Sequence, residues 1–143
     1  MYRGSMVGFQ RILYGGLCSG AIFYLALLSY LHLVNDRALA LISGTTLSLV
    51  GIAVVGRVLT LQAKVVQTLL AYLVAASMLT VAVTADGFFL HPGLAKDVDW
   101  TVAGVIEHAA RIFILIALPG CLLATVGHLI ARTVWSFWRR QAP

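Results

Sequence analysis

The chain has 143 residues, of which 61% are hydrophobic and only 10% are charged, and its formal net charge is +5. A soluble domain of this size carries about 25% charged residues. The polar side chains are therefore too few to cover a surface that faces water. This composition excludes an ordinary soluble enzyme or binding domain and predicts an integral membrane protein that is covered largely by lipid.

Four apolar runs follow one another along the chain, and each has the roughly 20 residues that a helix needs to cross a bilayer. They cover about 12–34, 38–59, 65–85 and 102–138, the last with its core at 112–131. Open strands cannot satisfy their backbone hydrogen bonds in lipid. The runs therefore predict an all-α integral membrane protein, a single domain over 1–143 whose four transmembrane helices form an up-down-up-down bundle. Segment 86–100 is its expected outer loop.

The charged residues divide unequally between the two predicted sides of the membrane. Four spans place both chain ends on one side, and all five acids fall on the other side. The positive-inside rule then predicts that both termini are cytoplasmic, and we expect a bacterial inner membrane. The basic residues flank spans instead of forming a patch, so nucleic acid is not an expected partner. The predicted headgroup anchors are Arg57, Lys64, Arg132, Trp135, Trp138, Arg139 and Arg140.

The loop before the fourth run carries turn and capping signals. Asp86-Gly87 predicts a turn that ends the third helix. Asp97 or Asp99 is the expected N-cap of a helix that starts near Trp100. Within that helix, Pro119-Gly120 predicts a kink, because a proline nitrogen cannot donate a backbone hydrogen bond.

A polar cluster opens this fourth helix in the stretch "VIEHAARIF". Glu107 and Arg111 have the i, i+4 spacing of an ion pair, and His108 lies on the same arc of the helix. We expect this outer polar cluster at the membrane interface, where it either meets headgroups or faces the bundle and lines a site.

Two histidines are candidates for holding a cofactor. His32 and His108 end and begin spans on the same side, and in a closed bundle these spans can be neighbours. Together they could ligate a b-type haem, or a metal with help from a carboxylate, although a protein without any cofactor is the first expectation. His108 and His128 are 20 residues apart, about 160° around an ideal helix, which argues against a stack of two haems.

Small residues form stripes that favour close helix packing. They either pack this bundle internally or dock it to another integral membrane subunit or a second copy. The stripes consist of Gly16 and Gly20 in the first run, Gly44, Ser48 and Gly51 in the second, and Gly120 and Ala124 in the fourth.

One partial resemblance to a known family rests on three features. They are the segment "FQRILYGGLCSG", the arginines Arg57 and Arg132 that end the second and fourth spans, and the expected position of both termini on the cytoplasmic side. Together these features resemble the small four-helix proteins linked to flipping of polyprenyl-phosphate sugars. The asparagine-containing segments that precede those arginines in the family are absent, which leaves the sugar-lipid substrate without its usual motif. The resemblance implies a carrier or accessory protein for lipid-linked sugars.

Three functions remain open from the sequence. No phosphate-binding loop, nucleophile elbow, HExxH or paired-carboxylate motif is present, so a non-enzyme is favoured. The first expectation is a non-catalytic accessory subunit of a larger inner-membrane complex, such as a bioenergetic one. The second is a small carrier or accessory for lipid-linked sugar or small-solute translocation, with an open groove and Arg57, Lys64 or Arg132 facing an anionic headgroup. The third is a haem or metal redox protein that uses His32 and His108.

Overall fold

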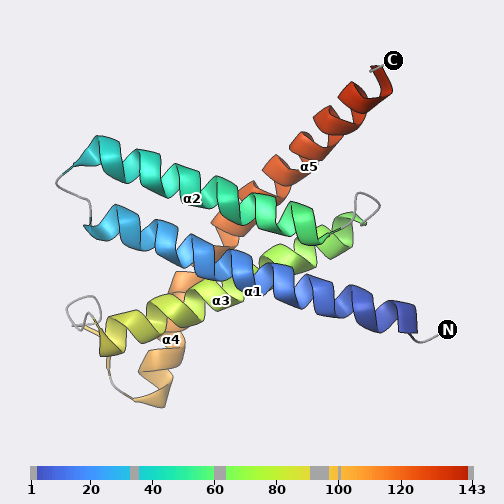
Figure 1. The fold of residues 1–143 in the computed structure, drawn as a ribbon. Coiled ribbons are helices and arrows are strands. Elements are labelled where there is room, and N and C mark those ends of the chain that lie inside the picture. Colours follow the sequence, from blue (N-terminus) through green and yellow to red (C-terminus); the bar gives the residue numbers. More distant parts are fainter. Residues whose placement is uncertain (1–2, 33–35, 60–63, 91–96, 100, 142–143) are drawn as a thin grey trace.

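The computed structural model of the protein describes residues 3–32, 36–59, 64–90, 97–99 and 101–141, and the regular elements among them are all helical (Figure 1). Four stretches are long and apolar enough to cross a membrane, as the sequence predicts. The elements are α1 (Arg3–His32), α2 (Arg37–Val58), α3 (Val65–Phe89), α4 (Val102–Ile112), the π-helical turn η2 (Phe113–Ala117) and α5 (Leu118–Gln141).

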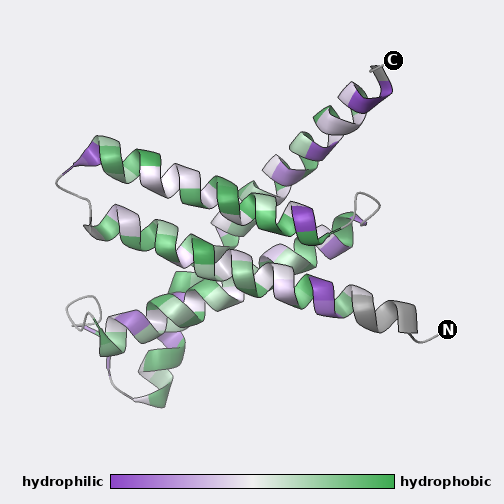
Figure 2. Cartoon of the chain, in the orientation of Figure 1, coloured by the Kyte–Doolittle hydropathy of each residue, from purple (hydrophilic) through white to green (hydrophobic). Residues whose placement is uncertain are grey.

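The hydropathy pattern matches this division of the chain (Figure 2). Apolar residues cover the middle of the helices, and hydrophilic residues gather near their ends. Helices α1 and α2 run side by side in opposite directions, and both marked chain ends lie at the same end of the molecule (Figure 1). We call this end the basic end, because it carries Arg57, Lys64, Arg132, Arg139 and Arg140.

Local hydrogen bonds fix where the helices begin. The Asp36 carboxylate accepts from the backbone nitrogen of Leu39 at 3.1 Å, which caps α2. At α4 the cap is Thr101, whose hydroxyl accepts from the Gly104 nitrogen at 3.2 Å. The expectation of Asp97 or Asp99 as this cap is wrong. Asp99 instead accepts a hydrogen bond from the Thr101 hydroxyl at 3.4 Å, so it supports the capping residue.

Helix α1 packs closely against α3 through two glycines. A methyl group built on Gly16 would lie 2.6 Å from the carbonyl oxygen of Ala71, and one on Gly20 would lie 2.6 Å from that of Ala75. Real Cβ atoms do not approach backbone oxygens this closely. Glycine at these two positions therefore allows the backbones of α1 and α3 to come together.

Helix α1 also packs against α2, and here aromatic rings fill the space over two glycines. The Tyr30 ring lies over Gly44 and the Phe23 ring over Gly51. The buried Ser19 hydroxyl donates to the carbonyl of Gly51 at 3.0 Å, which adds a hydrogen bond between the helices. The stripes of Gly16 and Gly20 and of Gly44 and Gly51 thus face other helices of the same chain.

Helix α3 extends beyond its predicted end. It runs to Phe89, so Asp86 and Gly87 lie inside the helix and do not form the predicted turn. The reason is tertiary packing, because Asp86 and Phe88 bury their side chains against the bundle. Such burial outweighs the weak local preference of an Asp-Gly pair. The outer loop consequently starts after the first few residues of the predicted 86–100 segment.

The fourth span changes its hydrogen bonding before the proline. In η2 the backbone bonds reach five residues back, and the Leu118 nitrogen donates to the Phe113 carbonyl. A proline ring normally collides with the carbonyl four residues earlier, which here belongs to Leu115 in the middle of η2. The wider π turn gives this carbonyl room. The departure from α-helical bonding thus lies one turn before Pro119, while a kink at Pro119-Gly120 itself stays a prediction.

Candidate functional site: two grooves and a polar junction

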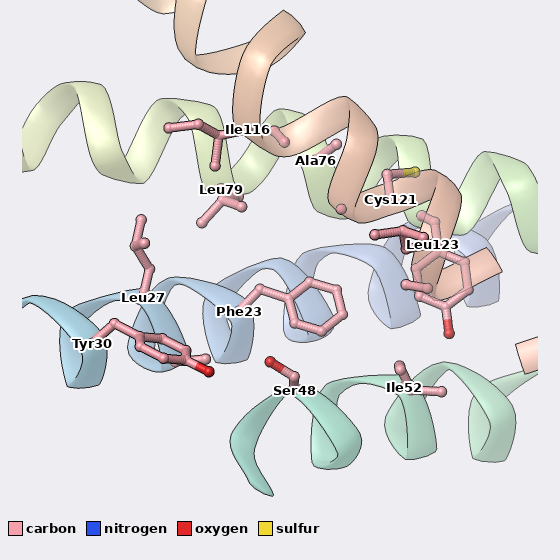
Figure 3. Close-up of a pocket in the computed structure, with 15 residues that line it drawn as sticks. Phe23, Leu27, Tyr30, Ser48, Ile52, Ala76, Leu79, Ile116, Cys121 and Leu123 are labelled. Atoms are coloured by element: carbon pink, nitrogen blue, oxygen red, sulfur yellow. The ribbon is translucent and has the colours of Figure 1, made fainter. Parts of the chain in front are cut away.

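An apolar groove of about 440 Å³ lies between α1, α2, α3 and the η2–α5 segment (Figure 3). Large side chains of α1 and Ile52 of α2 form one wall, and the η2–α5 segment forms another with both large and small residues. The residues labelled in Figure 3 are Phe23, Leu27, Tyr30, Ser48, Ile52, Ala76, Leu79, Ile116, Cys121 and Leu123. Gly120 and Ala124 also line it; Ala124 belongs to the buried core as well, while a methyl group on Gly120 would meet nothing within 4 Å.

The groove offers little to a polar ligand. The Ser48 hydroxyl donates to the carbonyl of Gly44 at 2.8 Å, so its hydrogen-bond donor is already used within α2. Cys121 is buried in the groove wall and is a free thiol. A space of this size and polarity suits a hydrocarbon chain better than a sugar or an ion.

A polar junction lies at the end of this groove that is nearer to the basic end of the molecule. The fully buried Tyr72 hydroxyl, from α3, lies 3.2 Å from Nδ1 of His128 on α5. The two rings meet edge to face with centroids 5.9 Å apart. A methyl group on Gly56 of α2 would touch the imidazole at 3.4 Å, so His128 packs against α2 as well. Three helices therefore meet at one hydrogen-bonded pair.

A second groove, of about 650 Å³, opens at the basic end of the molecule. Its described lining holds three arginines and no acid. The Arg139 guanidinium lies 5.8 Å from the centroid of the Trp135 ring, a distance typical of a cation–π contact. The lining residues are Val65, Leu129, Arg132, Thr133, Trp135, Ser136, Arg139 and Arg140.

The predicted headgroup anchors thus differ in where they lie. Arg132, Trp135, Arg139 and Arg140 line the basic groove. Arg57 and Lys64 are exposed outside it, and so is Trp138. Guanidinium groups that converge on a concave surface are suited to hold a phosphate or carboxylate.

The outer polar cluster lies on α4, at the opposite end of the molecule. Glu107 and Arg111 form the ion pair that their spacing predicts, and their side chains are 64% and 70% exposed. His108 turns away from them toward α3, where its ring meets that of Phe88 edge to face at 5.9 Å. The cluster therefore divides into a solvent- or headgroup-facing ion pair and a histidine packed on the bundle.

Because both members of the Glu107–Arg111 pair are exposed, its removal should matter little. We expect the substitution Glu107→Gln to change the free energy of unfolding by less than about 1 kcal/mol. The loss of folded protein on heating in detergent measures this change. A loss of several kcal/mol would show that Glu107 has a buried partner.

The histidine pair proposed for a cofactor is described only in part. His32 ends α1, but its side chain lies outside the described residues, so its approach to His108 stays a prediction. Among the described residues, no group of three or more His, Cys, Asp and Glu side chains gathers as a metal site would require.

One buried acid was not singled out from the sequence. Asp86 is only 4% exposed, and Tyr24 of α1 lies near its carboxylate. Acids inside membrane bundles are rare and often functional. The apolar residues Phe88 and Phe89 after Asp86 were a signal that the helix continues, but the Asp-Gly pair favoured a turn.

Sequence reasoning also missed the polar junction. Tyr72 and His128 are 56 residues apart, and His128 read simply as an interfacial residue near Arg132. The usable signal was that both are polar side chains on faces that small residues otherwise occupy. Comparison with protein-family models, with curated proteins and with solved structures gave no match to this chain.

Proposed function

We propose that this protein is a small membrane carrier, or an accessory protein to one, that holds the hydrocarbon part of an amphipathic ligand in its apolar groove. The observation that carries the proposal is the groove itself, a half-open apolar space between four helical segments of one chain. A lipid-linked solute has such a hydrocarbon part. Its tail can enter sideways from the bilayer without leaving an apolar environment.

The basic groove supports an anionic head on that ligand. Arg132, which the sequence offered as a headgroup contact, lines this groove together with Arg139 and Arg140. Both grooves lie along α3 and α5, so one ligand can reach them. We propose that the basic end faces the cytoplasm, as the positive-inside rule indicates. A bend at Pro119-Gly120 would shape the groove wall next to Gly120.

The other two expectations have less support. A subunit that docks through its small-residue stripes needs those stripes on its surface, but Gly16, Gly20, Gly44 and Gly51 face helices of the same chain. A redox role for His32 and His108 lacks a described ligand set. An accessory role therefore enters the proposal only as assistance to translocation.

Filling the groove should abolish ligand binding. In the variant Ser48→Phe a ring enters the groove from α2, where Ser48 points into it (Figure 3). We expect photolabelling by a phospholipid with a diazirine in its acyl chain to fall at least tenfold at Cys121 and Leu79. The reason is steric, because the ring occupies the space of the tail. Mass spectrometry of the labelled peptides gives the result.

The matched control is Thr46→Phe, which places the same ring on the exposed face of α2 two residues away. Groove labelling should persist in this variant. Equal labelling of the groove in Ser48→Phe and Thr46→Phe would overturn the proposal. Extraction in mild detergent provides a separate check, because stable co-purification with the subunits of a respiratory or other complex would favour the accessory-subunit function.

A further inference from the structure

The two grooves are separated by a thin barrier. On α3, Val65 lines the basic groove and Tyr72 lines the apolar groove, seven residues or about 10 Å apart at 1.5 Å per residue. On α5, Ala124 lines the apolar groove and Leu129 the basic groove, about 7.5 Å apart by the same rise. The barrier is therefore only one to two helical turns thick.

This barrier contains apolar side chains such as the buried Ala71, but it also contains several polar ones. Tyr72 and His128 hydrogen-bond to each other across it. Thr68 lies one turn from Tyr72 toward the basic groove, is fully buried, and its hydroxyl has no hydrogen-bond partner among the described residues. An apolar barrier would seal the two grooves without the cost of burying these groups.

Thr68 differs from the two other buried threonines that lie along these helices, although the hydroxyl of Thr84, farther along α3, also lacks a hydrogen-bond partner among the described residues. Thr80 and Thr125, which are also buried, donate to the carbonyl four residues earlier in their own helices, at 2.9 and 2.8 Å. Thr68 makes no such bond. A buried hydroxyl that leaves its donor unused costs free energy in this one state of the protein. That cost is recovered in any state in which a polar group passes beside it.

From these observations we infer that the Tyr72–His128 hydrogen bond is the gate of a polar passage between the two grooves. The polar head of a groove-bound amphiphile crosses the barrier by exchanging hydrogen bonds with Tyr72, His128 and Thr68, while its tail stays in the apolar groove. This inference rests on the proposed function for the nature of the ligand, but opening of the gate can be measured without any ligand.

The buried thiol of Cys121 reports whether the gate is open. The variant Cys18→Ser removes the other, exposed thiol and leaves Cys121 in the groove wall. In proteoliposomes, a membrane-impermeant anionic methanethiosulfonate, which the arginines of the basic groove do not repel, is added on the side of the basic end. The rate at which this reagent modifies Cys121 is divided by the rate at which membrane-permeant N-ethylmaleimide modifies the same thiol. This ratio corrects for the intrinsic reactivity of the thiol.

We expect slow modification in the Cys18→Ser background and modification about fivefold faster when Tyr72→Phe is added, because a neutral hydrogen bond contributes about that factor to the closed state. His128→Leu should have the same effect. His128→Asn, which places an amide oxygen where Nδ1 lies, should restore slow modification. Thr80→Val is the matched control, since it removes a buried hydroxyl from α3 two turns away from Tyr72 and should leave the rate unchanged.

Equal rates in the parent, Tyr72→Phe and His128→Leu, with all three eluting as folded protein in gel filtration, would overturn the gate. So would fast modification in the parent, because the barrier would then already be open. Should His128→Leu fail to fold, Tyr72→Phe and His128→Asn still test the gate, because the gate requires faster modification of Cys121 in Tyr72→Phe than in His128→Asn. Loss of acyl-chain photolabelling tests the proposed function separately, so failure of one is distinguishable from failure of the other.

Discussion

Replacing Gly20 with leucine is expected to prevent α1 and α3 from packing together. Even a methyl group at this position would lie 2.6 Å from the Ala75 carbonyl oxygen and 2.7 Å from Cβ of Met78. A backbone carbonyl cannot move aside as a flexible side chain can. We expect a destabilisation of about 3 kcal/mol, at the upper end of what overpacking costs, and a matching loss of folded protein after heating in detergent.

The chain provides a control at Gly127 of α5. A methyl group there would meet nothing within 4 Å, and the residue is exposed. Gly127→Leu should therefore keep the stability of the unsubstituted protein or raise it slightly, because leucine favours a helix more than glycine does. Equal loss of stability in Gly127→Leu and Gly20→Leu would contradict the close approach of α1 and α3.

Removing two arginines from the basic groove should have the second large effect. The double variant Arg139→Ala/Arg140→Ala deletes two of the three cations that line it. Each such cation contributes about 1 kcal/mol near an anionic lipid surface, so we expect about 25-fold weaker retention of a phosphate monoester lipid. Native mass spectrometry from mixed micelles measures this against a zwitterionic lipid of the same chain length.

Arg57→Ala/Lys64→Ala is the control for net charge. It removes the same two positive charges from the same end of the molecule, but these residues do not line the groove. We expect most of the lipid retention to survive. If both double variants lose the lipid equally, the arginines act only through the overall charge of the basic end, and the groove has no special role in binding the head.

The helices were predictable because lipid imposes a strong requirement on sequence. Each span needs an apolar run of fixed length, and the predicted 38–59 run differs by one residue at each end from Arg37–Val58 of α2. The ion pair of Glu107 and Arg111 was predictable for a similar reason, since it depends only on the repeat of one helix. Local periodicity was sufficient in both cases.

The grooves depend on how the helices cross, and no local pattern encodes that. Gly16 and Gly120 look alike in the sequence, yet one meets the α3 backbone and the other lines open space. The predicted end of α3 was wrong for the same reason. Asp86 stays helical because it is buried against the rest of the bundle, which its local sequence does not show. Tyr72 and His128 become a pair only when α3 and α5 pack together.

The π-helical turn between α4 and α5 has a consequence for the phase of the fourth span. A π turn contains one residue more than an α turn, and one residue corresponds to about 100° of rotation. Counting 20 residues from His108 to His128 at a uniform 100° each therefore misplaces His128, and the angle of about 160° drawn from the sequence does not apply. The residues before and after η2 therefore belong to two helices, and the rotation of one around the helix axis is offset from that of the other. The first helix turns His108 toward Phe88, and the second turns His128 toward Tyr72.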